Sequence, residues 1–137
     1  MPIHSIQAAA LAVLLGAAPA AAQVAEQHFR GGRTADLAAL CAASPREALG
    51  SEAIAWCHGF VVAAAQYHAS ASAEGGAHRP VFCLPEPTPT LDDARTGFVA
   101  WVRANPQHGT ERAMDGLMRF AAATFPCPRP EAARRGR

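Results

Sequence analysis

The residues whose number and spacing say most about chemistry are four cysteines: Cys41, Cys57, Cys83 and Cys127. They form no C-x-x-C pair, so the sequence offers no thioredoxin-like redox motif, no haem-attachment motif and no close ligand pair of the common zinc sites. An even number of cysteines in a short exported chain instead predicts two disulfides, with four buried thiols as the alternative. Three pairings are open. We favour Cys41–Cys57 with Cys83–Cys127, because the first two lie at similar distances on either side of a predicted turn at residues 44–50.

Six histidines raise the question of a metal site. His58 and His68 fall near one stripe of a predicted long helix, but their separation is about 15 Å along a helix axis, so they cannot share one ion. We interpret them as histidines in the core or at its rim. His78 and His108 fall in predicted loops, where solvation is the simpler account. The sequence therefore predicts no metal and no cofactor.

The acidic residues indicate no catalytic pair. Asp92 and Asp93 are adjacent, and neighbouring residues on a helix do not face each other, so helix capping explains them better than acid–base catalysis. The chain contains no G-x-S-x-G, P-loop, H-E-x-x-H or G-x-G-x-x-G motif. A cysteine–histidine nucleophile would need a free thiol, which the disulfide prediction excludes. We expect a protein that is not an enzyme.

Composition favours one folded globular domain. The chain has 137 residues, of which 50% are hydrophobic and 17% are charged, and its formal net charge is +1. Without a basic excess the chain cannot neutralise many phosphates, which excludes a strong electrostatic case for nucleic-acid binding.

Residues 1–22 have the pattern of a secretory signal peptide. An uncharged, alanine-rich apolar run from Ile6 to Ala18 is followed by Pro19 and by small residues at Ala20 and Ala22, which suit cleavage after Ala22. The run is too short to span a hydrocarbon core of about 30 Å, and the alternative is a buried or interfacial N-terminal helix. Cleavage would leave an exported, periplasmic protein without a membrane segment.

Helical periodicity and capping residues predict an all-α fold, a small disulfide-stabilised bundle of about four principal helices within residues 34–127. No strand periodicity is present. The expected helices run from a Thr34 cap to about Ala43, from a Ser51 cap over Glu52–Ala73, over Leu91–Ala104 behind a Thr90 cap, and over Thr110–Thr124 with an Asp115–Arg119 ion pair. We expect residues 23–33 to be a flexible lead-in and residues 128–137 to be a disordered basic tail.

The long predicted helix carries two apolar stripes. One contains Cys57 and Val61, and the other contains Trp56, Phe60 and Tyr67 on nearly the opposite side. A helix that is apolar on two sides is either central to a bundle or shared between a core and an interface. We therefore expect Trp56, Phe60 and Tyr67 to form a core face or a homodimer face.

Three short cysteine motifs and one upstream cysteine follow one another in a recognisable order. The motifs are Cys57-His58-Gly59-Phe60-Val61, Cys83-Leu84-Pro85 and Phe125-Pro126-Cys127, with Cys41 upstream. This order resembles the Rap/Tai family of immunity proteins of the type VI secretion system, over roughly Thr34 to Cys127. The family commonly has Tyr after the glycine, where this chain has Phe60.

The resemblance implies a small periplasmic all-α protein, often dimeric, that binds a peptidoglycan amidase effector and sterically blocks its Cys–His active-site cleft. It also implies structural roles for the four cysteines and for Gly59, which would allow close helix packing. Pro85 and Pro126 belong to the same structural motifs. No motif transfers the residues that contact the effector.

The partner-binding residues must be inferred from physics alone. The predicted loop at residues 70–80 carries Glu74, His78 and Arg79, which could reach into an effector cleft, and the alternative is a solvated connection. An alternative function is a periplasmic structural or chaperone-like interaction module that uses the aromatic stripe. A third is a small enzyme or metal carrier.

Overall fold

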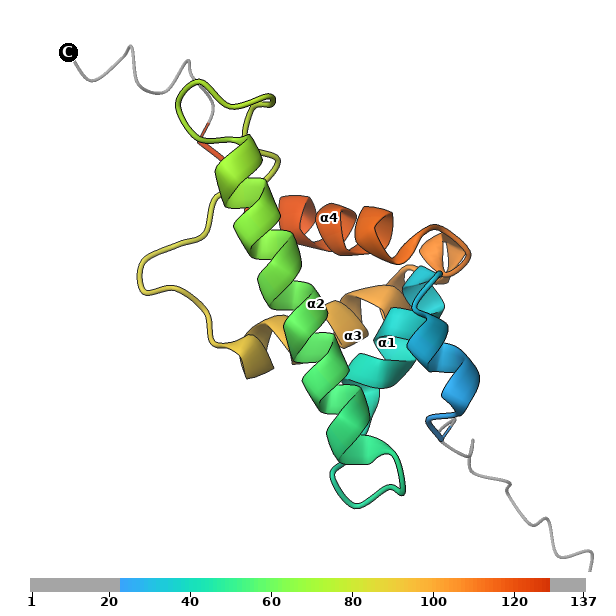
Figure 1. Cartoon of the computed structure of the whole chain (residues 1–137). Helices are drawn as coiled ribbons and strands as arrows, with labels where there is room; N and C mark the ends of the chain where they lie inside the picture. The colour runs from blue at the N-terminus through green and yellow to red at the C-terminus, as the bar shows by residue number, and fades with distance from the viewer. Residues whose placement is uncertain (1–22, 129–137) are drawn as a thin grey trace, which may run out of the picture.

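A computed structural model describes residues 23–128, and every regular element in that part of the chain is a helix. The elements are η1 (Glu26–Arg30), α1 (Thr34–Ala42), α2 (Gly50–Ala71), α3 (Leu91–Ala104), η2 (Pro106–His108) and α4 (Ala113–Thr124). Figure 1 shows the long α2 crossing one side of the molecule, with α1, α3 and α4 packed behind it. The predicted all-α bundle of four principal helices is confirmed. The predicted signal peptide and residues 129–137 of the predicted tail lie outside the described residues.

The disulfides join the cysteines in the favoured pairing, Cys41–Cys57 and Cys83–Cys127. The first links α1 to α2 and is buried, with Cys41 1% and Cys57 0% exposed. The second links the segment after α2 to the residues after α4, and both of its cysteines are half-buried. The two cross-links therefore secure different parts of the fold.

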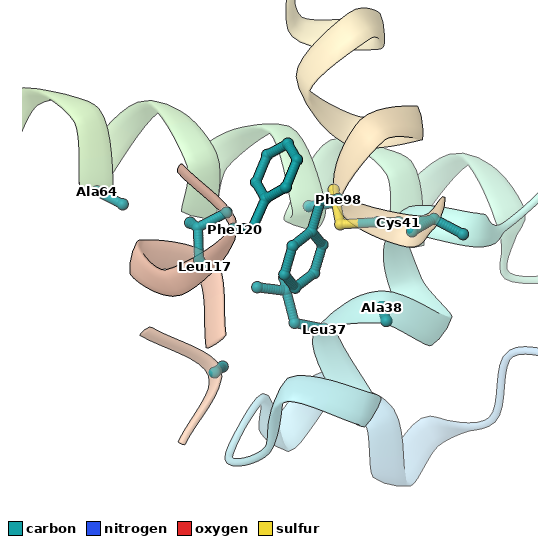
Figure 2. Packing of buried hydrophobic residues seen from close by; sticks show 10 residues of the cluster. Leu37, Ala38, Cys41, Ala64, Phe98, Leu117 and Phe120 are labelled. Atoms are coloured by element: carbon teal, nitrogen blue, oxygen red, sulfur yellow. A yellow bond between two sulfur atoms is a disulfide. The ribbon is translucent and has the colours of Figure 1, made fainter. Parts of the chain in front are cut away.

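The centre of the core holds few large side chains. Phe98 of α3 and Leu37 of α1 are fully buried beside the Cys41–Cys57 disulfide, as Figure 2 shows. The Phe98 ring meets the Phe120 ring of α4 edge-on, with centroids 5.8 Å apart, an arrangement that aromatic pairs favour. Much of the remaining buried surface comes from alanines, in line with the alanine-rich composition.

The start of α1 differs from the prediction. Thr34 is the first helical residue and Arg33 occupies the N-cap position, so the predicted Thr34 cap is wrong. The Thr34 hydroxyl is fully buried and donates to the backbone oxygens of Glu111 (3.3 Å) and Arg112 (3.1 Å). A Cβ at Gly116 would collide with the Thr34 side chain, so a glycine is needed where α4 meets α1.

The start of α2 also differs. The helix begins at Gly50, with Leu49 at the N-cap position, so the predicted Ser51 cap is wrong. The turn before the helix is closed by the Ser44 backbone N–H, which donates to Glu47 Oε1 (2.9 Å). A Cβ at Gly50 would collide with the backbone carbonyl of Ser44, so the tight turn sets where α2 begins.

The predicted cap of α3 is confirmed. The Asp93 backbone N–H donates to Thr90 Oγ1 (3.1 Å), and the Thr90 backbone N–H donates to Asp93 Oδ2 (3.0 Å), which is a reciprocal capping box. The Arg95 guanidinium reaches back to α1 and donates to the backbone oxygen of Cys41 (2.8 Å). The start of α3 is therefore held both locally and by the core.

The last helix begins at Ala113 rather than Thr110. The preceding residues dock on α1 instead, since the Thr34 backbone N–H donates to the Glu111 backbone oxygen (2.8 Å). The predicted Asp115–Arg119 pair is wrong, because Asp115 pairs with Arg112 (2.8 Å) and Arg119 pairs with Glu111 (2.7 Å).

Residues 23–33, which the sequence predicts to be a flexible lead-in, include the short helix η1 and pack against the bundle. Within them η1 ends at Gly31, which has the left-handed φ of 60° that glycine favours. Phe29 packs against the small cluster of Leu40, Ala43 and Ala53. This segment covers the ends of α1 and α2 that carry the buried disulfide.

Candidate interaction surface

A loop at residues 72–80 follows α2 and projects from one end of the molecule, at the top of Figure 1. The loop turns tightly, since the His78 backbone N–H donates to the Ala71 oxygen (3.0 Å) and Gly75 has a φ of 78°. Glu74, His78 and Arg79 are all exposed on it. None of the three forms an ion pair within the described part of the chain, so all three are available to a partner.

His68 anchors the return of this loop. Its Nε2 accepts a hydrogen bond from the Val81 backbone N–H (3.0 Å), and its ring stacks on the Phe82 ring at a centroid distance of 3.9 Å. The sequence indicates a histidine in the core or at its rim at position 68, but no local pattern indicates a bond across 13 residues. The loop is therefore fixed at both ends, although its tip is exposed.

The aromatic stripe of α2 divides into a packed part and an exposed part. The rings of Trp56 and Phe60 are stacked 5.4 Å apart and pack against the core, and the Trp56 ring lies against Gly31. Tyr67, about two turns farther on, is 69% exposed. The three side chains do not form one continuous exposed surface, so only Tyr67 can contribute a large contact area to a partner.

Gly59 lies on the exposed side of α2. A Cβ at this position would meet no atom within 4 Å, so helix packing within this chain does not account for the glycine. Its neighbours one turn away, Ala55 and Ala63, are also exposed. Together they make a flat strip on the outside of the long helix.

A strap, residues 83–90, spans from the second disulfide to the start of α3 and bows away from the helices in Figure 1. Pro85 lies in its exposed part. One end is held by Cys83, whose backbone N–H donates to the Phe125 oxygen (2.8 Å), and the other end is held by the Thr90 cap. Pro126 lies two residues beyond α4, where it prevents continuation of the helix toward Cys127.

An apolar groove of about 230 Å³ lies under the strap, between the C-terminal half of α2 and α4. Val61, Leu117, Met118 and Phe120 are among the side chains that line it. A second, more open hollow adjoins it and includes Asp93 of α3. Sequence reasoning missed both, because the groove exists only where the strap, α2 and α4 come together.

The ionic contacts at the start of α4 are structural. Two hydrogen bonds lower the pKa of the Glu111 carboxyl because they stabilise its charged form; the bond from His108 has the larger effect and the bond from Arg119 the smaller. The hydrogen bond to Asp115 raises the pKa of Arg112 for the same reason. Through Glu111, the contacts with His108 and Arg119 tie η2 to α4, whereas the Arg112–Asp115 pair lies within the first turn of α4.

The described residues hold no evident reaction centre. No three histidine, cysteine, aspartate or glutamate side chains gather there as metal ligands, and both cysteine pairs are oxidised. His58 Nε2 is buried without a hydrogen-bond partner and lies 3.7 Å from Asp92 Oδ1, which is too long for a proton-transfer contact. The surfaces with distinctive geometry in the described part of the chain are the loop at residues 72–80 and the groove under the strap.

Comparison with known proteins gives one match. The family model of the Rap1a immunity proteins matches residues 33–127, which spans all four α-helices and both disulfides. No curated protein and no solved structure matches the chain. No helix among residues 23–128 combines the length and apolar character needed to cross a membrane.

Proposed function

Because the chain belongs to the Rap1a immunity proteins, we propose that it protects its producer by binding a peptidoglycan amidase effector of the type VI secretion system and sterically blocking the amidase in the periplasm. Family membership over residues 33–127 is the observation that carries this proposal. The role that the family name implies is binding to a toxic effector rather than catalysis.

Two features support the periplasm as the site of action. The described chain contains two disulfides, which form and persist in oxidising compartments such as the bacterial periplasm. Residues 1–22 carry the apolar run and small residues of a signal peptide. A peptidoglycan amidase also meets its substrate in that compartment.

The loop at residues 72–80 suits steric inhibition. It is narrow, it projects from the end of the bundle, and it is held at its base by the Val81–His68 hydrogen bond. Glu74, His78 and Arg79 supply charged and hydrogen-bonding groups at its surface. We assign these three residues to contact with the amidase, with the loop occupying the cleft that peptidoglycan would enter.

Protection from lysis tests the proposal. A peptidoglycan amidase effector of the producing organism is exported to the periplasm of a sensitive host with or without the oxidised chain Gln23–Arg137, and lysis and the dissociation constant are measured. Protection together with binding of the two purified proteins is expected. If the host lyses equally fast with and without the chain and the two proteins do not bind, the proposed function is wrong.

A matched pair of variants tests the loop. Arg79→Glu reverses an exposed charge in the loop, whereas Arg103→Glu reverses an exposed charge on α3. We expect Arg79→Glu to weaken amidase binding by at least about tenfold, or about 1.4 kcal/mol, because the energetically important residues of an interface are enriched in arginine and cluster near its centre. Equal affinity for the two variants would show that the loop does not enter the interface.

A homodimer is the second partnership that we propose, through the exposed side of α2. The flat strip of Ala55, Gly59 and Ala63 lies beside Tyr67, so a second helix could approach closely and cover the tyrosine. Sedimentation of the purified chain and of Gly59→Arg tests this idea. A wild-type dimer that the variant converts to a folded monomer is expected, and a wild-type monomer at high concentration would contradict it.

A further inference from the structure

Insertion of the loop at residues 72–80 into the amidase gives no role to the apolar groove under the strap. We propose that it receives one apolar side chain of the effector, flanked on the effector by basic residues. This inference rests on the proposed function, because it takes the amidase as the partner. It adds a second contact in which the immunity protein is the receiving surface.

The lining decides the chemistry of the occupant. The floor is made of hydrocarbon and thioether groups, including Val61, Leu117 and Met118, and the aromatic ring of Phe120. The polar side chains that line it are Gln66 and two threonines of the strap, and none of them is charged. A charged or strongly polar group would lose its hydration there without gaining a partner, so an apolar group is favoured.

The size of the groove favours a side chain over a larger ligand. Its volume is about 230 Å³. An apolar cavity of about 150 Å³ holds one benzene molecule, whereas pockets for cofactors and drug-sized ligands are roughly 300–1,000 Å³. The groove therefore has room for one phenylalanine, leucine or methionine side chain and the start of its backbone.

The rim is already in place for such a contact. Leu84 on the strap is 45% exposed and Leu91 at the start of α3 is 41% exposed, and both line the groove. Pro85, Pro87 and Pro89 restrict the backbone of the strap, and the Cys83–Cys127 disulfide holds its end. A rim that needs no ordering loses little entropy on binding, which is a property of strong anchor sites.

The charged residues around the groove indicate which residues of the effector should flank the inserted side chain. Asp93 is the one charged residue lining the groove or the adjoining hollow. Glu86 on the strap and Asp92 beside Leu91 are exposed; of these two, only Asp92 has basic neighbours within the described residues, Arg95 at 3.1 Å and His58 at 3.7 Å. The rim therefore carries a net negative charge, which complements arginine or lysine residues beside the inserted side chain.

Filling the groove tests the proposal. Ala94 of α3 lines the groove, whereas Ala100 lies on the exposed side of the same helix, so Ala94→Leu fills the groove and Ala100→Leu is the matched control. Affinity for the same amidase effector is measured by calorimetry for the wild type and both variants. Ala94→Leu is expected to weaken binding at least about tenfold, and Ala100→Leu to leave it unchanged.

A second measurement probes the groove without the amidase. Toluene, the side chain of phenylalanine in isolation, is titrated into the oxidised chain while the methyl resonances of Leu84, Leu91 and Met118 are followed by NMR. Shifts at these methyls that are absent in Ala94→Leu are expected. No shift up to the solubility limit of toluene would show that the groove does not admit an apolar group, and would overturn the proposal.

The outcomes separate the two proposals. If the wild type does not bind the amidase, the proposed function fails and this inference fails with it. If the wild type binds and Ala94→Leu binds equally well, only the inference is overturned. Loss of self-association in Ala94→Leu with unchanged amidase affinity would assign the groove to a second copy of the chain and would likewise overturn it.

Discussion

The two disulfides lie in parts of the molecule that are built in different ways. At the core end, Cys41 and Cys57 are buried among Leu37 and Phe98, where three helices pack on one another. At the strap end, Cys83 and Cys127 are half-buried and join segments that contain no helix. The core end would keep much of its contact surface without its cross-link, whereas the strap end depends on its cross-link for its shape.

The residues that stabilise the fold by burial therefore lie mainly at the core end, and the residues exposed to a partner lie mainly at the strap end. Burial of apolar groups stabilises the core end, and close packing leaves little freedom to change its residues. The strap end exposes two leucines, the groove and the loop at residues 72–80, and it is held by a disulfide and a few hydrogen bonds. A surface built in this way can change its side chains without loss of the fold.

The largest expected effect is at the core end. Phe98→Ala removes a fully buried ring between α1 and α4, and we expect it to lower the free energy of unfolding by about 3–5 kcal/mol. Leu84→Ala at the strap end is the control, and a change within about 0.5 kcal/mol is expected for this exposed residue. Urea unfolding followed by circular dichroism measures both. Equal losses would remove the distinction between the two ends.

The next effect comes from the strap cross-link. Replacing Cys83 and Cys127 together by alanine opens a loop of 44 residues, and we expect a loss of about 2–4 kcal/mol with the helical circular dichroism signal retained. The same double replacement of Cys41 and Cys57 should also disturb Phe98 packing, visible in the near-ultraviolet spectrum. A strap variant that loses its helices would contradict the comparison.

The different exposure of the two disulfides predicts the order in which a reductant opens them. Thiol–disulfide exchange requires approach to a sulfur atom, so a water-soluble reductant should open Cys83–Cys127 before the buried Cys41–Cys57. Alkylation of the native protein after graded reduction, followed by peptide mass spectrometry, identifies the first thiols released. Release of Cys41 first would show that the core end opens more readily than its burial implies.

The sequence predicted what local rules determine. The Thr90 cap depends on a residue three positions away, and the helix lengths depend on periodicity, so both were within reach of sequence reasoning. The disulfide pairing was favoured because a turn brings Cys41 and Cys57 onto facing helices. The cysteine motifs also indicated the family that the comparison confirms.

What the sequence could not predict arises from contacts between distant segments. Thr34 was expected to cap its own helix, but docking of α1 on α4 gives its hydroxyl two backbone partners 77 and 78 residues away. Arg119 was paired with Asp115 by spacing, and the turn before α4 supplies Glu111 instead. The groove has the same origin, since each of its walls comes from a different element.

A smaller effect is expected at the base of the loop. His68→Phe keeps an aromatic ring against Phe82 but removes the acceptor for the Val81 backbone N–H, which should cost about 1 kcal/mol. Hydrogen exchange at Val81 should accelerate, while amides in α1 and α3 keep their protection. His78→Phe, in the exposed tip of the same loop, is the control and should leave exchange at Val81 unchanged.

The smallest expected effect is a difference in acid sensitivity between two surface carboxyls. Hydrogen bonds from His108 and Arg119 lower the pKa of Glu111, and the hydrogen bonds with Thr90 lower the pKa of Asp93. A carboxyl whose folded pKa lies below its unfolded value stabilises the protein above the unfolded pKa. That contribution is lost as the pH falls through the folded pKa.

Glu111→Gln and Asp93→Asn should therefore each be less stable than the wild type at pH 7. Each difference should shrink below about pH 4, near the ordinary pKa of these carboxyls.

The two carboxyls that these variants remove differ in the contacts they make. Glu111 joins η2 to α4, whereas Asp93 bonds only within the first turn of α3. Unfolding in urea at pH 7 and pH 3 measures both differences, and a difference that grows at pH 3 would reverse the assigned sign. Added salt should weaken the Glu111 contribution more, because Glu111 pairs with the charged guanidinium of Arg119, whereas Asp93 bonds only to the uncharged groups of Thr90.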